Sequence, residues 1–265
     1  MKKKLLILYL LLSLAFSQRI ISTAPSITET IFLLGAQDHL VAVSKYCDYP
    51  QQAKSIENIG GYLDYNAERI LLLKPDMVFL FNGNDNLQKF LAHNKISYKQ
   101  FDNESISGIL SMIQEVGNVV NKSEVAAGIV GKLKEKLYQH QKTFAPKPKI
   151  KVLVVIEQVL KGGNAQGLYI LGKEKFYSIL LEDTGFENVY KGNMRYPLVA
   201  PESLYSLQPE AIIVIEDGDV HSYESIKVSA IKNKKIFFLK DAVYKRPGPR
   251  FAEILDKFAQ IRSQL

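Results

Sequence analysis

Two segments of this 265-residue chain carry the same pattern 134 positions apart. Residues 66–80 read NAERILLLKPDMVFL, and residues 200–214 read APESLYSLQPEAIIV. The matched positions hold a glutamate, a proline, an acid and, just upstream, a tyrosine: Glu68 with Glu202, Pro75 with Pro209, Asp76 with Glu210, and Tyr62 with Tyr196. A shared helix–proline–strand unit explains the prolines and the aliphatic residues, but neither the glutamates nor the tyrosines. The repeat therefore predicts two similar lobes that line a cleft from both sides.

Apolar runs of strand length alternate with helical patterns along both halves. The predicted strands are 19–22, 40–43, 77–81, 96–101, 151–156, 212–215 and 236–239, and the predicted helices are 28–34, 87–93, 121–141 and one from 251 onward. Such alternation is typical of α/β lobes with mostly parallel sheets. The helix from 121 would be about 30 Å long, which is enough to cross from one lobe to another.

The predicted fold class is thus α/β, with two Rossmann-like lobes, mostly parallel sheets, a single long connecting helix, and a ligand cleft between the lobes. We expect an N-terminal lobe over 18–120, the connecting helix over 121–145 and a C-terminal lobe over 146–265.

Residues 1–17 have the three regions of a secretory signal peptide: Lys2–Lys4, an apolar run from Leu5 to Phe16, and small residues before the cleavage point after Ser17. An apolar run of about 12 residues is too short for the roughly 30 Å hydrocarbon core of a membrane. We therefore expect export and cleavage. The one cysteine, Cys47, does not end this run, so no lipid anchor is expected, and it reads as a small buried hydrophobe.

Composition and motifs argue against several function classes. Loss of the leader lowers the formal net charge from +7 by three, to +4, which is too little and too dispersed to indicate nucleic-acid binding. The four histidines lack zinc-ligand spacing, and Gly162–Lys173 lacks the Ser/Thr that completes a phosphate loop. Asp217–Asp219 is expected to be a turn rather than a cation site, and no GxSxG occurs.

Aromatic residues, in contrast, gather at predicted strand ends and turns: Tyr46, Tyr62, Tyr65, Phe81, Tyr196 and Tyr244. In open α/β sheets, ligands bind outside the carboxyl ends of the strands. Each aromatic residue taken singly fits a core or rim position. Together they favour a pocket for a large, flat or partly apolar ligand.

With these residues assembled, the chain resembles the periplasmic cobalamin-binding proteins of ABC importers, within a wider class that also captures ferric siderophores and haem. The resemblance covers nearly all of the mature chain. Its marks are RIISTAPSITETIFLLGA, VAVSKYCDYP, IGGYLDYNAERILLLKPDMVFL, RYPLVAPESL and YKRPGPRF.

The resemblance implies a role for individual residues. Tyr46, Tyr62, Phe81 and Tyr196 match ring-contacting aromatics, and the loop with Tyr244 and Arg246 matches a ligand contact of the C-terminal lobe. Glu68 and Glu202 match an exposed pair, one per lobe, that meets arginines on the two copies of the permease. Helix N-terminal acids favoured by the macrodipole are the alternative explanation of this pair.

Together these features predict a monomeric periplasmic binding protein that delivers a corrinoid, with cobalamin as first candidate, to the permease dimer of an ABC importer. It is expected to have no catalytic residues, no metal site of its own and no resident cofactor. A ferric-siderophore or haem carrier is the alternative, because Lys245 stands where the cobalamin binders tend to have an acid. An exported enzyme on the same scaffold and a structural or adhesion module are further alternatives.

Overall fold

The computed structural model describes residues 18–265 except 217, 219, 224 and 225, and the predicted leader peptide and the turn at Asp217 and Asp219 fall outside these residues. The described chain forms two compact units. The first runs to Phe101 and includes Val116–Ser123, and the second comprises Asp102–Glu115 and Glu124–Leu265. The lobe boundaries expected from the sequence stay a prediction.

The first unit is built on a parallel sheet with the strand order β2-β1-β3-β4. Its strands are β1 (Ile20–Ser22), β2 (Leu40–Val43), β3 (Met77–Phe81) and β4 (Tyr98–Phe101). Its helices are α2 (Pro25–Leu33), α3 (Ala67–Leu73) and α4 (Asp85–His93), with the short 3-10 helices η1 (Gln37–His39) and η2 (Gln51–Ser55). The strands predicted at 40–43 and 77–81 are confirmed to the residue.

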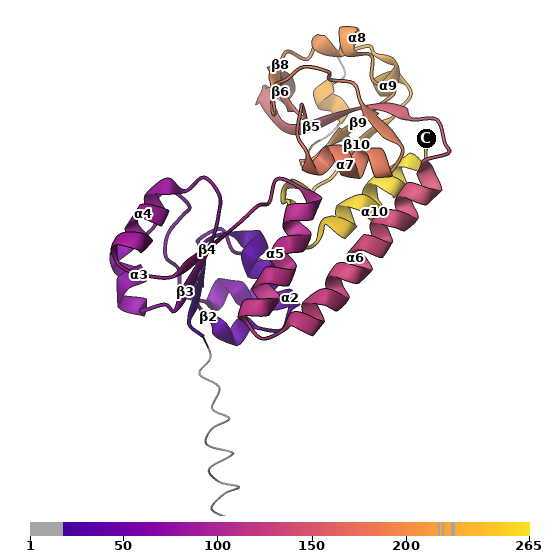
Figure 1. Ribbon diagram of the computed structural model, residues 1–265. Coiled ribbons are helices and arrows are strands. Elements are labelled where there is room, and N and C mark those ends of the chain that lie inside the picture. Colours follow the sequence, from indigo (N-terminus) through magenta and orange to yellow (C-terminus); the bar gives the residue numbers. More distant parts are fainter. Residues whose placement is uncertain (1–17, 217, 219, 224–225) are drawn as a thin grey trace, which may run out of the picture. The chain divides into compact units, whose positions relative to one another are not determined.

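Helices cover both faces of this sheet, with α3 and α4 on one face and α2 on the other (Figure 1). Val78 and Leu80 point to the first face and pack with Ile70 of α3 and Leu91 of α4. Phe79 points to the opposite face, where it meets Phe101 edge-on. Because both faces are buried, β1, β2 and β3 are almost entirely apolar, as parallel strands are, whereas the edge strand β4 is polar and partly exposed.

The second unit has a mixed sheet with the order β10-β9-β5-β6-β8, and β7 pairs with β5. Its strands are β5 (Ile150–Lys161), β6 (Asn164–Ile170), β7 (Phe186–Asn188), β8 (Leu198–Val199), β9 (Ala211–Val214) and β10 (Ile236–Phe238). Strands β5, β7, β9 and β10 are parallel, whereas β6 runs antiparallel to β5 and to β8.

Gly162 and Gly163 form the turn of the β5–β6 hairpin, with φ angles of 58° and 82°. Two successive positive φ angles are what a two-residue hairpin turn requires, and glycine adopts them without strain. The glycine pair thus serves a hairpin, and β5 continues five residues beyond the predicted end at Ile156.

The second sheet is also covered on both faces. Helices α8 (Ser203–Leu207) and α9 (Ser229–Lys232) lie on one face, and α7 (Phe176–Asp183) and α10 (Phe251–Arg262) lie on the other (Figure 1). The unit also contains the 3-10 helices η3 (Val220–Tyr223) and η4 (Ala242–Lys245). Leu204 and Ala230 close the α8/α9 side of the core against Leu153 and Val214.

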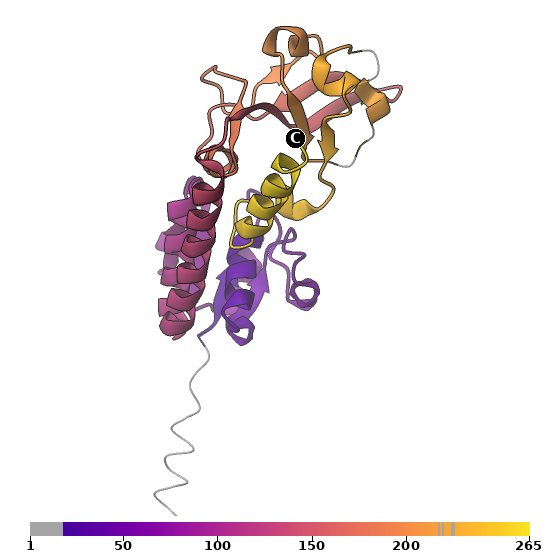
Figure 2. The same ribbon diagram turned by 90° about the vertical axis from the view of Figure 1, so that its right-hand side faces the viewer.

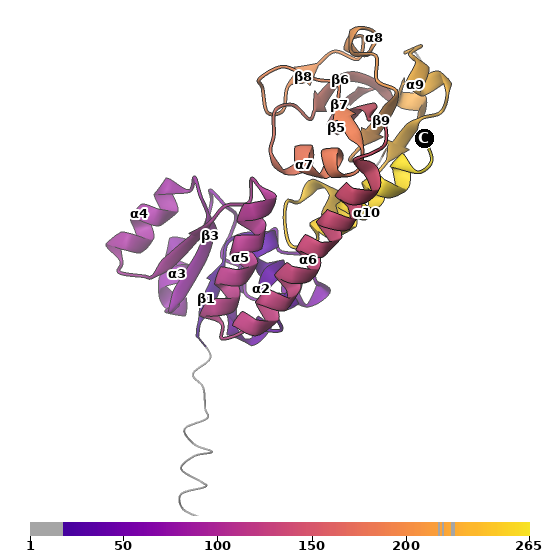
Figure 3. The ribbon, with the colours of Figure 1, turned by 45° about the vertical axis from the view of Figure 1, so that its right-hand side comes forward.

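Two longer helices follow β4. They are α5 (Ile106–Val119), which the sequence pattern did not predict, and α6 (Ser123–Phe144), which confirms the long helix expected from residue 121. In the second unit the C-terminal half of α6 lies beside α10 (Figures 2 and 3), where Lys136 and His140 both contact Asp256. Among the described residues, no helix combines the length and apolar character that crossing a bilayer requires.

The repeat found in the sequence corresponds to the same helix–turn–strand connection in both units. Helices α3 and α8 each end in a left-handed residue with a φ of 44°, Lys74 and Gln208. Each is followed by a proline and then by the strand, β3 or β9. Asp76 accepts a hydrogen bond from the backbone N–H of Arg19 at 2.8 Å, and Glu210 accepts one from Lys151 at 2.9 Å. The repeated acid therefore fastens the strand entry to the neighbouring strand in both units.

Candidate functional site

Three predicted aromatic residues gather at the carboxyl ends of the strands of the first unit. Phe81 is the last residue of β3, and Tyr46 follows β2 and is 52% exposed. The hydroxyl of Tyr62 donates to the carbonyl oxygen of Asn82 at 3.2 Å, which holds the Tyr62 loop at the end of β3. The side chain of Asn84 completes this attachment by donating to the Tyr62 carbonyl at 2.7 Å.

A tight loop presents Tyr62. Its entry residue, Gly60, has a φ of 89° and forms an isolated antiparallel bridge with Tyr65. A Cβ atom at residue 60 would collide with the carbonyl oxygen of Asp64. The loop turns Tyr65 toward the core, where it packs on Phe90 with ring centroids 5.8 Å apart. Tyr65 thus packs against the core of the first unit, and both Tyr65 and Tyr62 are half-buried.

An ion pair joins the Tyr46 and Tyr62 loops. The Lys45 ammonium lies 2.6 Å from a carboxylate oxygen of Asp64, and it also lies 5.3 Å from the centroid of the Tyr46 ring. The hydrogen bond between the two groups raises the pKa of Lys45 and lowers that of Asp64. Both groups are therefore ionised around neutral pH, and the two loops are connected by charge as well as by backbone bonds.

In the second unit, Tyr196 lies just before β8 and is 39% exposed. The guanidinium carbon of Arg195 lies 5.4 Å from the Tyr196 ring centroid. The same guanidinium pairs with Glu104 at 2.6 Å and lies 3.9 Å from Glu174. Burial, and then the charge of Glu174, raise the pKa of the Tyr196 phenol, so its hydroxyl remains a hydrogen-bond donor at neutral pH.

Tyr177 holds the Tyr244 loop. Its hydroxyl donates to the Tyr244 carbonyl at 2.6 Å. Burial raises the pKa of Tyr177 strongly, and the proximity of Tyr196 and Glu174 adds to this effect. Glu174, 4% exposed, accepts the backbone N–H groups of Phe176 and Tyr177 at 2.8 and 2.7 Å, so it caps α7. Burial raises its pKa as well, despite these bonds.

The loop predicted to contact ligand in the second unit is η4 and the residue that follows it. Tyr244 and Arg246 are both half-buried there, and burial raises the pKa of Tyr244. Lys245 between them pairs with Glu216 at 3.3 Å, and the other oxygen of Glu216 accepts the backbone N–H of Gln158. The positive charge that favoured an anionic ligand is therefore partly neutralised within the protein.

The structure thus groups the predicted ligand-binding residues into two sets. Tyr46, Tyr62 and Phe81 belong to the first unit, and Tyr196, Tyr244 and Arg246 belong to the second. Sequence reasoning missed Lys45, Asp64, Glu104, Glu174, Tyr177 and Arg195. Lys45, Asp64 and Arg195 lay within the quoted motifs, whereas Glu104 carried no signal, because its partner Arg195 is 91 positions away.

The two predicted docking glutamates are exposed at helix starts. Glu68 lies in the first turn of α3, and Glu202 is the N-cap residue of α8. Across the part of the chain that the structure describes, neither carboxylate takes part in an ion pair or a side-chain hydrogen bond. Both carboxylates are therefore available to a partner, although a helix N-terminal acid would look the same.

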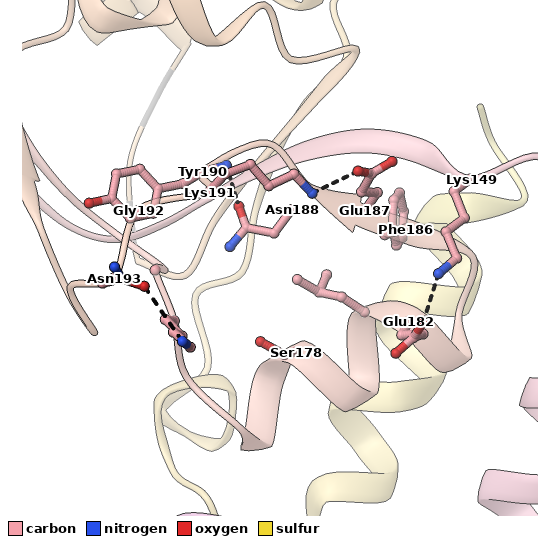
Figure 4. Close-up of a pocket in the computed structure, with 13 residues that line it drawn as sticks. Lys149, Ser178, Glu182, Phe186, Glu187, Asn188, Tyr190, Lys191, Gly192 and Asn193 are labelled. Carbon is pink, nitrogen blue, oxygen red and sulfur yellow. Dashed lines mark hydrogen bonds and ion pairs between the residues drawn. The ribbon is translucent and has the colours of Figure 1, made fainter.

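An open pocket of about 610 Å³ lies elsewhere in the second unit, beside α7 and β7 (Figure 4). Two of its three lysines form ion pairs, Lys149 with Glu182 and Lys191 with Glu187, both at 2.7 Å. None of the predicted ligand-binding residues lines it. The described residues also contain no cluster of histidine, cysteine and acidic side chains that could hold a metal ion.

Solved structures with this architecture are known. The fold is that of the two-lobe periplasmic binding proteins: it matches the vitamin B12-binding protein BtuF of Vibrio cholerae with a TM-score of 0.79 at 24% identity, over 93% of this chain and 97% of that one. The haem-binding protein BhuT, solved with two haems, also gives 0.79, at 18% identity over 93% and 98% of the two chains.

Sequence comparison gives the family. The sequence model of the "Periplasmic binding protein" family matches residues 20–243, and the chain belongs to that family. A vitamin B12-binding protein of Vibrio campbellii is 26% identical over 94% of this chain and 92% of its own length. A vitamin B12-binding protein of Vibrio vulnificus is also 26% identical, over the full length of both chains.

Proposed function

We propose that this protein is a periplasmic substrate-binding protein that captures a corrinoid, with cobalamin as the first candidate, and delivers it to an ABC importer. The observation that carries the proposal is the set of exposed or half-buried aromatics at the carboxyl ends of the strands of the first unit, together with Tyr196 and Tyr244 in the second. Aromatic faces bind large flat ligands through contact area, and their hydroxyls supply donors.

The charges beside these aromatics favour a corrinoid over a polyanionic chelate. Lys45, Arg195 and Lys245 each lie within 3.3 Å of a carboxylate of the same unit. Cations that are already paired gain little from a further anion, whereas the amide-bearing rim of a corrinoid needs donors and acceptors rather than a net charge. The relatives named as vitamin B12-binding proteins support the same ligand.

A haem or ferric-siderophore carrier is the second candidate. It is supported by the haem-binding BhuT and HutB structures, which share the fold with TM-scores of 0.79 and 0.74. The phenols of Tyr46, Tyr62 and Tyr196 also suit a ferric ligand, since phenolate oxygen is a hard donor. The raised pKa values of Tyr62 and Tyr196 oppose such a role, because a phenolate must form first.

The test is calorimetric titration of the mature protein with cyanocobalamin, cobinamide, haem and ferric siderophores. We expect tight binding of the corrinoids, and weakening by Tyr62→Ala or Tyr196→Ala of about tenfold or more each, the loss typical of a buried aromatic contact. Tight binding of haem or a siderophore without heat from either corrinoid would overturn the ligand assignment. Recovery of a chemically altered ligand would instead indicate an enzyme.

The partner in this proposal is the two-fold permease of an importer in the inner membrane. A permease with two identical halves presents the same basic patch twice, and a protein with two similar units can answer with one carboxylate on each. Glu68 and Glu202 occupy matching positions of the repeat and are exposed. Among the described residues, neither of their carboxylates forms an ion pair or a side-chain hydrogen bond. Export by the leader at 1–17 and a monomeric state complete the proposal.

A further inference from the structure

In each unit a cationic side chain lies over the ring of an exposed tyrosine, and that tyrosine is the next residue in the sequence. Lys45 lies over the ring of Tyr46 with its ammonium 5.3 Å from the centroid, and Arg195 lies over Tyr196 at 5.4 Å. A cation within about 6 Å of an aromatic centroid is attracted to the ring face. The same local arrangement thus occurs at one proposed ligand-binding tyrosine of each unit.

A carboxylate from another loop holds each cation. Asp64, which anchors Lys45 at 2.6 Å, belongs to the Tyr62 loop. Glu104, which anchors Arg195 at 2.6 Å, precedes α5 within the second unit, and buried Glu174 lies 3.9 Å from the same guanidinium. Each cation is therefore held near its ring by an ion pair, although both are partly exposed.

We propose that Lys45 and Arg195 are positioning residues: each covers one face of its tyrosine and holds the ring ready for ligand on the other face. The inference rests on the proposed function, since it takes Tyr46 and Tyr196 as ligand contacts. An exposed tyrosine that samples several rotamers loses this freedom when a ligand binds, and a ring ordered beforehand avoids much of that cost.

The first experiment needs no ligand. 3-Fluorotyrosine is introduced at residue 46 or 196, and the ¹⁹F resonance is recorded for the parent protein and for Asp64→Asn or Glu104→Gln. Loss of the anchoring charge should move each resonance toward the position of a solvent-exposed tyrosine. Lys45→Arg should keep the parent position because it keeps the cation. The control is Glu182→Gln, which breaks the Lys149 pair of 2.7 Å away from both rings.

The second experiment measures ligand affinity in a double-mutant cycle. Lys45→Met should weaken corrinoid binding by about two- to fivefold, the range expected for an exposed cation–π contact or ion pair. In a Tyr46→Leu background the same change should have no further effect, because the lysine acts through the ring. Arg195→Met and Tyr196→Leu form the matching cycle in the second unit.

The two experiments separate this inference from the proposed function. Unchanged ¹⁹F resonances in Asp64→Asn and Glu104→Gln would overturn the positioning role, whatever the ligand. Equal losses of affinity with and without the tyrosine would overturn it too, since the cation would then act on the ligand directly. If no corrinoid binds the parent protein, the ligand assignment fails, and the fluorine experiment still decides the inference.

Discussion

At the residue scale, Glu174 at the start of α7 is a buried carboxyl group whose burial disfavours its charged form. Glu174 is 4% exposed and satisfies two backbone N–H groups of the helix. Its carboxylate lies 3.9 Å from Arg195, which is too far for a close ion pair. Burial therefore prevails, and the pKa of Glu174 is raised.

The raised pKa predicts a specific pH dependence of stability. The folded protein holds the Glu174 proton more tightly than the unfolded chain, so the contribution of this group to stability falls as pH rises from about 4.5 toward neutrality. The variant Glu174→Gln has no titrating carboxyl group at this position, but it also loses one of the two oxygens that accept hydrogen bonds from the backbone of α7. The free energy of unfolding of the parent protein minus that of the variant should be larger at about pH 4.5 than at about pH 7, measured by urea unfolding. A pH-independent difference would contradict the burial effect.

The Tyr62 loop depends on one glycine. Gly60→Ala should destabilise the protein by about 1–3 kcal/mol, because residue 60 has a positive φ and its Cβ would meet the Asp64 carbonyl. Thermal unfolding measures the loss. Gly128→Ala within α6 is the matched control: apart from the adjacent residues and the backbone of α6 itself, no atom lies within 4 Å of the added methyl group, so this change should be neutral or stabilising by up to about 1 kcal/mol.

At the element scale, the repeated acid is a strand fastener in both units. The Asp76 N–H donates back to the Arg19 carbonyl at 2.8 Å, and the Glu210 N–H donates to the Lys151 carbonyl at the same distance. Each acid therefore makes one side-chain and one backbone bond to the neighbouring strand. The position is structural in both copies, unlike the exposed glutamates upstream.

Asp76→Ala and Glu210→Ala should each lower stability by about 0.5–1.5 kcal/mol, the net worth of one hydrogen bond. Ligand affinity should be unchanged, since neither residue lies among the aromatics. Chemical denaturation of the two variants, run side by side, provides the measurement. A loss of stability in only one of the two variants would show that Asp76 and Glu210 contribute unequally to stability although they make the same hydrogen bonds.

The same elements explain what could be predicted from the sequence. The runs Leu40–Val43 and Met77–Phe81 are continuous and apolar because both faces of a parallel sheet are covered, and they were located to the residue. The β5–β6 hairpin was missed, because β6 contains Asn, Gln and Gly and shows no apolar run, so no second strand was expected after Gly162 and Gly163. Short strands such as β7 and β8 have too few residues to show a period.

The candidate site divides in a similar way. Aromatic residues at strand ends are visible in a sequence, and Tyr46, Tyr62 and Phe81 do gather at one edge of the first sheet. Ion pairs are not visible when their partners are far apart. Arg195 and Glu104 are 91 positions apart, and only the folded chain brings them together. The positioning role of the cations could therefore not be predicted.

At the scale of the whole molecule, the two matched glutamates should act together. Glu68→Lys or Glu202→Lys alone should reduce ligand uptake by cells, and the double variant should abolish it while calorimetric affinity for the ligand is retained. Reversed charge at both units would oppose a basic patch that occurs twice on the partner. Radiolabelled ligand uptake and titration of the purified protein measure the two effects. Normal uptake by the double variant would exclude the docking role.

The left-handed caps at Lys74 and Gln208 have a broader consequence. Both adopt the same backbone angle, and in both units a helix, a cap, a proline and a strand entry are fixed by contacts made inside that unit. The segments 66–76 and 200–210 therefore share the end of the helix, the turn and the strand entry. A chimaera that carries the second segment in place of the first should retain the turn, the proline and the fastening acid. Each copy is thus free to diverge on its outer surface while its backbone stays the same.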